Sequence, residues 1–200
     1  MTILGLIMLN ACEHSTDAPE SSPDYYQLAP GNYWVYEVQQ IWNDTSIEVL
    51  PETDSIYIEK DTLINNVKYS KIVGDDWLNI TYNYFLRDSI GYLVDYKGKV
   101  HFSEVNFTDT LYAHTDHFVR IAYKMDANDS LISVPLGSFN CRFYRGTITL
   151  LYPSMNNLTK TQGEFRADGI GLITSNIVSA GEPDFRIKKN LLRYHLANTN

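Results

Sequence analysis

The chain has 200 residues, of which 44% are hydrophobic and 13% aromatic, and its formal net charge is −8. This length suits one domain or two, and the composition is that of a globular protein that buries a core of its own. The acidic balance, with no cluster of basic residues, argues against nucleic acid and anionic lipid head groups as partners.

The beginning of the chain combines a short apolar run, Ile3–Leu9, with the sequence Asn-Ala-Cys that ends at Cys12. A secretory signal needs such an apolar segment followed by small residues at the cleavage site. The run is shorter than the roughly 20 residues of a membrane-spanning helix. It resembles the end of a bacterial lipoprotein signal peptide, which implies that residues 1–11 are removed and that Cys12 carries the lipid. No Lys or Arg precedes the cysteine, so we expect the true start upstream of Met1.

The alternative for Cys12 is an ordinary buried thiol, but residues 13–24 are polar and offer it no core to join. We expect residues 12–24 to be the lipidated cysteine and a flexible linker, because this stretch has prolines and acids and no apolar period. In the sorting rule of enteric bacteria, Glu13 in place of Asp implies the outer membrane. The expected location is therefore the cell envelope, as an outer-membrane lipoprotein on the periplasmic side or the cell surface.

Residues 25–200 form a series of aromatic and β-branched stretches separated by turn residues, which predicts strands. We expect a loop or edge excursion at 43–51, a hairpin turn at Asn65-Asn66 and at most a helical turn at 156–161. Turn signals recur at the spacing of antiparallel β folds, so the predicted fold is all-β: a single strongly curved antiparallel sheet, half-barrel or open barrel of roughly ten strands with little helix. The predicted strands are 33–42, 54–64, 67–73, 80–87, 92–96, 99–105, 110–113, 117–125, 131–134, 138–152, 164–167, 171–178 and 185–196.

The opening strand, with Gly31-Asn32-Tyr33-Trp34-Val35-Tyr36, resembles that of uncharacterised lipoproteins from the Bacteroidota. In those proteins a lipobox and a polar linker lead to a Pro-x-x-x-Gly-Asn-x-Trp-x-Tyr stretch, whereas here Pro30 directly precedes the glycine. The segments 61–69, 135–141 and 169–173, the last with the sequence Gly-Ile-Gly-Leu-Ile, look similar too. The resemblance implies a curved sheet, such as the half-barrel of lipoprotein carriers, and no known chemistry.

A local pattern of Asp, then Ser or Thr, then an apolar residue recurs along the domain. These triplets resemble the acceptor sequence for periplasmic O-glycosylation in the Bacteroidota, and a sugar needs an exposed hydroxyl. The alternative is that Asp and Ser/Thr simply favour turns before the next strand. The hydroxyl residues of these triplets are Ser55, Thr62, Ser89, Thr110 and Ser130.

Aromatic side chains are abundant, and they offer a ligand large apolar area with a polar handle. We expect most of them to fill the concave side of the sheet as core, with a carbohydrate or hydrophobic-ligand face as the alternative. The candidates for that face are Trp34, Trp42, Trp77, Tyr82 and Tyr84, and Trp77 is expected to be the most exposed because it follows Gly-Asp-Asp.

No pattern predicts a catalytic or cofactor site. His114 and His117 would point to opposite faces of a strand, and with His101 as the nearest further ligand they do not predict a metal site. Residues 126–129 lack the Gly and Glu of a calcium loop. Cys141 has no neighbouring His, so core packing is expected for it.

Three functions are compatible with these sequence features. The first is a lipid-anchored, monomeric, non-enzymatic binding or assembly module without a cofactor, which holds a hydrophobic or glycan ligand or an envelope protein against the concave face of its sheet. The second is a structural or adhesive surface lipoprotein. The third and most remote is a hydrolase, which would need clustered carboxylates or a histidine dyad in a cleft.

Overall fold

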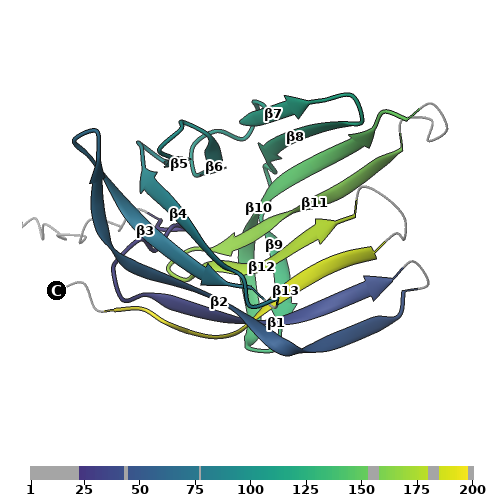
Figure 1. The fold of residues 1–200 in the computed structure, drawn as a ribbon, viewed down its shortest axis with the longest axis horizontal. Helices are drawn as coiled ribbons and strands as arrows, with labels where there is room; N and C mark the ends of the chain where they lie inside the picture. The colour runs from purple at the N-terminus through teal and green to yellow at the C-terminus, as the bar shows by residue number, and fades with distance from the viewer. Residues whose placement is uncertain (1–22, 43–44, 77, 153–157, 180–184, 198–200) are drawn as a thin grey trace, which may run out of the picture.

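The structure is a computed structural model that describes residues 23–42, 45–76, 78–152, 158–179 and 185–197. These residues contain strands, turns and irregular segments and no helix, so none of them belongs to a helix able to cross a membrane. The strands form one 13-stranded sheet (Figure 1). They are β1 (Tyr33–Trp42), β2 (Ile47–Ile64), β3 (Val67–Asp75), β4 (Thr81–Asp88), β5 (Tyr92–Asp95), β6 (Val100–Ser103), β7 (Tyr112–Thr115), β8 (Val119–Met125), β9 (Ser130–Val134), β10 (Gly137–Leu150), β11 (Thr159–Ala167), β12 (Gly171–Val178) and β13 (Phe185–His195).

The sheet is antiparallel and curls into an almost closed barrel. Its strand order is β6-β5-β4-β3-β2-β1-β13-β12-β11-β10-β8-β7, and β9 pairs with β10 outside this path. Figure 1 shows the β5–β6 end of the sheet curving back toward β7, β8 and β10. The predicted all-β, single, strongly curved sheet is therefore confirmed, while the predicted number of about ten strands is too low.

Side chains bridge the opening between the two ends of the sheet. The hydroxyl of Tyr144 on β10 donates a hydrogen bond to the carbonyl oxygen of Val100 on β6 at 2.8 Å. Arg142 Nη1 donates to the carbonyl oxygen of Glu104 at 3.2 Å. The ring of Phe102, which has no exposed surface, lies 6.4 Å from the ring of Tyr144. Edge strand β6 is thus attached to β10 through side chains.

The N-terminal end of the described chain closes one end of the barrel. Tyr25 and Tyr26 are both buried, and their rings lie 5.8 and 6.1 Å from the ring of Phe102. Asp24 fixes this segment, because its carboxylate accepts the backbone N–H groups of Tyr26 and Gln27, each at 2.9 Å. The core therefore sits inside the curl of the sheet and is rich in aromatic rings.

Two segments depart from the sequence predictions. Residues 47–51, expected as a loop or an edge excursion, belong to β2, where residues 47–49 pair with β1. The register of β1 against β2 shifts between Glu37 and Gln39 and leaves residues 50–52 unpaired, so Pro51 lies where its missing N–H costs no ladder bond. Strand β11 begins at Thr159, so the end of the expected helical turn at 156–161 is strand; residues 156 and 157 lie outside the described residues.

Candidate functional site: a cavity on the concave face

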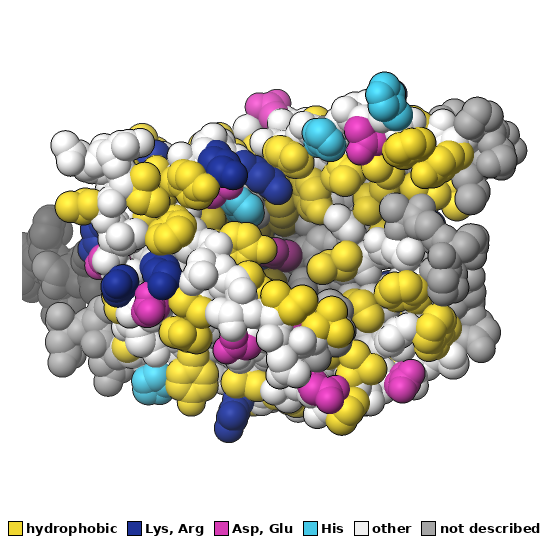
Figure 2. Space-filling model, in the orientation of Figure 1, with side chains coloured by type: hydrophobic (Ala, Val, Ile, Leu, Met, Phe, Trp, Pro, Cys, Tyr) yellow, Lys and Arg dark blue, Asp and Glu magenta, His cyan; other side chains and the backbone are white. Residues whose placement is uncertain are grey.

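A cavity of about 400 Å³ opens on the concave face of the sheet. Figure 2 shows this face hollowed near its centre, with hydrophobic side chains around the hollow, an acidic side chain deep inside it, and basic side chains and a histidine at one edge. The volume falls within the range of ordinary small-molecule sites. Its aromatic and aliphatic lining consists of Tyr26, Trp34, Tyr36, Ile56, Ile58, Ile72, Tyr82, Tyr84, Leu86, Tyr123, Tyr144, Leu172 and Ile177. Its polar lining includes Lys99, His101, Gln162, Glu164, Arg166, Ser175, Asn176 and Lys189.

Two tyrosine rings of the cavity wall lie directly over glycines of the neighbouring strand. Tyr82 on β4 is paired with Gly74 on β3, where a Cβ atom would come within 2.2 Å of the ring. Tyr123 on β8 is paired with Gly146 on β10, where the corresponding distance is 2.5 Å. Gln162 on β11 also donates a hydrogen bond to the Tyr123 hydroxyl. The glycines allow both rings to lie flat along the wall.

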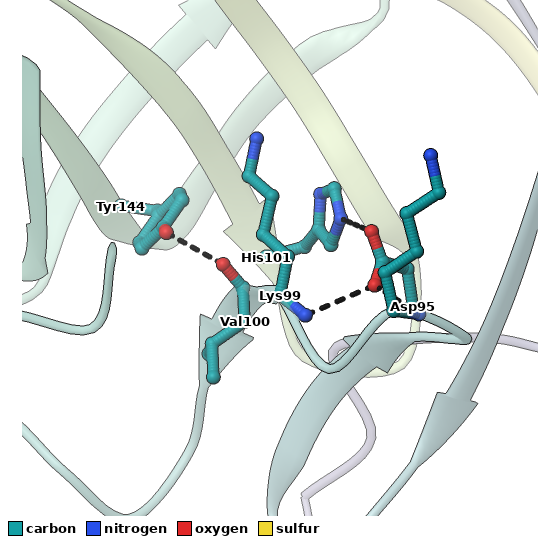
Figure 3. Close-up of polar contacts among 6 residues, drawn as sticks. Asp95, Lys99, Val100, His101 and Tyr144 are labelled. Carbon is teal, nitrogen blue, oxygen red and sulfur yellow. Dashed lines mark hydrogen bonds and ion pairs between the residues drawn. The ribbon is translucent and has the colours of Figure 1, made fainter. Parts of the chain in front are cut away.

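A turn between β5 and β6 places a histidine and a lysine side by side at the cavity (Figure 3). Asp95 Oδ1 accepts the backbone N–H groups of Lys97 and Lys99 at 2.8 and 2.9 Å, which fixes the turn. Asp95 Oδ2 lies 3.3 Å from His101 Nε2. Lys99 directly precedes β6 and His101 is the second residue of that strand, and Figure 3 shows the two side chains leaving the backbone on the same side.

The protonation states of this pair follow from its surroundings. Burial would raise the pKa of Asp95, but the hydrogen bonds from Lys99, His101 and Lys97 outweigh it and lower the pKa of the carboxyl. Burial lowers the pKa of His101, although the contact with Asp95 opposes this effect. The carboxylate is therefore charged and the imidazole neutral at neutral pH.

Two cationic side chains of the cavity lining, Arg166 and Lys189, form ion pairs with carboxylates. Arg166 Nη2 lies 2.9 Å from Glu164 Oε2, and both residues belong to β11. Lys189 Nζ on β13 lies 2.5 Å from Oδ2 of the fully buried Asp54 on β2. Burial raises the pKa of Asp54, while Lys189 opposes the rise. These two pairs leave little net charge in this part of the wall.

Lys99 has a different environment. Its Nζ lies 4.3 Å above the centre of the Tyr112 ring, a cation–π contact across the gap between the two ends of the sheet. Among the described residues, no carboxylate lies within ion-pair distance of this ammonium group. The cavity of a strongly acidic protein thus contains a cation whose charge is not matched by a neighbouring carboxylate.

The structure brings together part of the predicted aromatic face. Trp34, Tyr82 and Tyr84 line the cavity, and Trp34 is otherwise buried, with its Nε1 donating to the carbonyl oxygen of Ile170 at 2.8 Å. Trp42 is not in the cavity lining; it lies at the end of β1, 37% exposed, with its ring 5.8 Å from that of Phe185. Trp77 lies outside the described residues.

The predicted modification sites differ in exposure. Thr110 and Ser130 are exposed, the first before β7 and the second at the start of β9. Ser55 and Thr62 are half-buried within β2, and Ser89 is half-buried in the turn between β4 and β5. Cys12 lies outside the described residues. Glycosylation and lipidation stay predictions.

Other sequence candidates are also located. His114 lies on β7 and His117 follows it, both exposed, and the described part of the chain contains no group of three or more His, Cys, Asp and Glu residues able to hold a metal ion. Cys141 is fully buried, and burial raises its pKa to about 12, which suits a core residue.

The sequence patterns do not predict the polar half of the cavity, and they single out His101 only as a possible metal ligand. A usable signal exists in β11, where Gln162, Glu164 and Arg166 alternate along a strand. Alternation places them on one face. A strand with neighbours on both sides that carries only polar residues on one face indicates a polar surface inside the fold.

Comparisons with known proteins give a fold and no family. No family model matches the chain, and no curated protein matches its sequence. The chain is similar to a solved structure from Bacteroides fragilis, classed as an exported protein with a YmcC-like fold, with a TM-score of 0.52 and 10% identity over 87% of this chain and 100% of that one. It is also similar to a protein from Parabacteroides distasonis classed as a lipoprotein, with a TM-score of 0.51 and 10% identity over 88% of this chain and 100% of that one.

Proposed function

We propose that this chain is a lipid-anchored protein of the cell envelope that binds a small ligand in the cavity on its concave face and catalyses no reaction. The observation that carries the proposal is the cavity itself, because a sheet that served only as a scaffold would pack its concave side completely. Instead, about 400 Å³ is enclosed by aromatic and aliphatic side chains together with a few polar groups.

The lipid anchor has separate support. The sequence Leu9-Asn10-Ala11-Cys12 resembles a lipobox, and of the two similar folds one is classed as exported and the other as a lipoprotein. Both come from the group of bacteria whose lipoproteins the opening strand resembles. An intact-mass measurement of the protein purified from its native host tests the anchor. A chain that retains Met1 and carries an unmodified thiol at Cys12 would contradict it, and added hexose mass would indicate glycosylation.

Ligand binding can be tested with a neutral apolar dye. We expect the full chain to bind Nile red in a saturable manner with increased fluorescence. The variant Ile177→Trp adds bulk at a partly exposed position of the cavity lining and should abolish this signal. The matched control Leu131→Trp adds the same bulk at an exposed position on β9 outside the lining. Equal dye binding by both variants, or no binding by the unchanged protein, would contradict the proposal.

The absence of catalysis is a separate part of the proposal. The pair Asp95–His101 beside the cavity is the kind of group that a hydrolase would use as general base. We expect the purified chain to hydrolyse p-nitrophenyl butyrate no faster than its His101→Ala variant. Faster hydrolysis by the unchanged chain would favour an enzyme.

A further inference from the structure

We propose that the ligand is an amphipathic anion, with its anionic head group held at Lys99 and His101 and its apolar chain lying along the aliphatic wall formed by β2, β3, β4 and β12. This inference rests on the proposed function, since it names the class of molecule that the same cavity takes. It is carried by the distribution of charge around the cavity and by the separation of polar and aliphatic lining residues.

The distribution of charge in the cavity lining favours a negatively charged ligand. Arg166 is paired with Glu164, and Lys189 is paired with Asp54. Lys99, in contrast, rests on the Tyr112 ring, which attracts a cation through its π face without neutralising it. An anion that enters the cavity therefore finds an unneutralised ammonium group, partly shielded from water, and an ammonium ligand would be repelled by it.

The second polar group beside Lys99 strengthens an anion site. The charged groups around His101 are Asp95 from β5, Lys99 from the turn before β6 and Glu164 from β11. Its Nε2 is engaged with Asp95, which fixes the orientation of the ring next to the lysine (Figure 3). An anion bound between the two side chains favours the charged imidazole, so binding should take up a proton and become tighter as the pH falls.

The rest of the cavity fits an apolar chain. Aliphatic side chains from β2, β3, β4 and β12 lie along the wall, namely Ile56, Ile58, Ile72, Leu86, Leu172 and Ile177. The buried indole of Trp34 completes this surface. An ionic head group alone would leave this wall in contact with water, and a purely apolar ligand would leave Lys99 without an anion.

The experiment compares ligands that share one chain and differ in head group. Dodecanoate, dodecan-1-ol and dodecyltrimethylammonium are titrated against Nile red bound to the full chain. We expect dodecanoate to displace the dye at least tenfold more strongly than either of the others, which is about the effect of one favourable ionic contact. Dodecyl phosphate, added as a fourth ligand, separates carboxylate from phosphate head groups, and tight binding of either supports the inference.

Variants connect the effect to the proposed residues. Lys99→Met keeps the stem over Tyr112 but removes the charge, and it should lower the affinity for dodecanoate about tenfold while leaving dodecan-1-ol unchanged. Lys99→Gln serves as a second variant should the first fail to fold. Lys68→Met removes an exposed lysine on β3 and should change neither affinity.

The pH arm uses dodecanesulfonate, whose head group stays ionised. Its binding should tighten between about pH 8 and about pH 6 in the unchanged chain, and the effect should disappear in His101→Gln. Equal binding of all head groups, or unchanged dodecanoate binding by Lys99→Met, overturns the anion site and leaves the proposed function intact. Failure of Nile red itself to bind contradicts the proposed function instead.

Discussion

Replacing Phe102 with alanine should weaken the attachment of edge strand β6 to β10 more than any other single substitution at this sheet edge. The ring has no exposed surface and contacts Tyr25, Tyr26 and Tyr144. Removing a fully buried phenylalanine costs about 3–5 kcal/mol of the free energy of unfolding. In a domain of this size each kcal/mol lowers the melting temperature by about 2–4 °C, so a decrease of about 6–20 °C is expected.

Urea denaturation of the full chain followed by far-UV circular dichroism measures this loss. The control Phe118→Ala removes a ring that is 55% exposed and should cost less than about 1 kcal/mol. Hydrogen exchange adds a local test, because β6 has β5 as its strand neighbour and reaches β10 through side chains. The amides of β5 and β6 should therefore exchange faster in Phe102→Ala. A loss below about 1.5 kcal/mol, with unchanged exchange there, would refute the account of how the sheet closes.

Three further predictions concern stability. Gly163→Ala should lower the free energy of unfolding in urea by more than about 3 kcal/mol, because its Cβ would collide with a carbonyl oxygen of the adjacent strand. In the control Gly98→Ala the added Cβ meets no atom within 4 Å, so the loss should be about 1 kcal/mol. Equal losses in the two variants would contradict the predicted collision at Gly163. The hydroxyl of Tyr26 is buried and has no hydrogen-bond partner among the described residues, so a change to phenylalanine should leave the free energy of unfolding unchanged or raise it. The same change at Tyr36, whose hydroxyl donates to a buried carbonyl at 3.1 Å, should lower it by about 1 kcal/mol. The hydrogen bond from Arg145 lowers the pKa of Asp126 below the ordinary 3.8. The stability that this interaction adds is therefore present above pH 3.8 and is lost as the pH falls through the lowered pKa. Asp126→Asn should remove that part of the acid-induced loss of stability in pH-dependent unfolding, and an identical acid profile would contradict the assignment.

Local sequence patterns predict the strands well because turns and alternation are short-range. The predicted bounds of β1, Tyr33–Trp42, and of β12, Gly171–Val178, agree with the structure. The hairpin at Asn65-Asn66 also forms, with both residues at positive φ. The sequence leaves a loop or an edge excursion open around Pro51, since a bulge that removes the need for its N–H depends on the register of the partner strand.

The cavity is less predictable, because it depends on which faces of distant strands meet. Trp34, Tyr82 and Tyr84 were identifiable as aromatic residues on strands. No local sequence pattern indicates that Trp42 lies outside the cavity lining while Lys99 lies within it. A lysine beside a short edge strand ordinarily faces water, and here Lys99 turns inward because the sheet curls until β6 meets β7 and β10.

The pairs Tyr82 with Gly74 and Tyr123 with Gly146 have an evolutionary consequence. In each pair, the space available to a guest molecule is controlled by a backbone position on the adjoining strand rather than by the ring itself. A methyl group added at either glycine would collide with the ring, so the phenol would have to shift and the cavity would change shape. Homologues could therefore adapt to shorter or longer guests by exchanging glycine for alanine at these places, while every side chain that touches the guest stays the same.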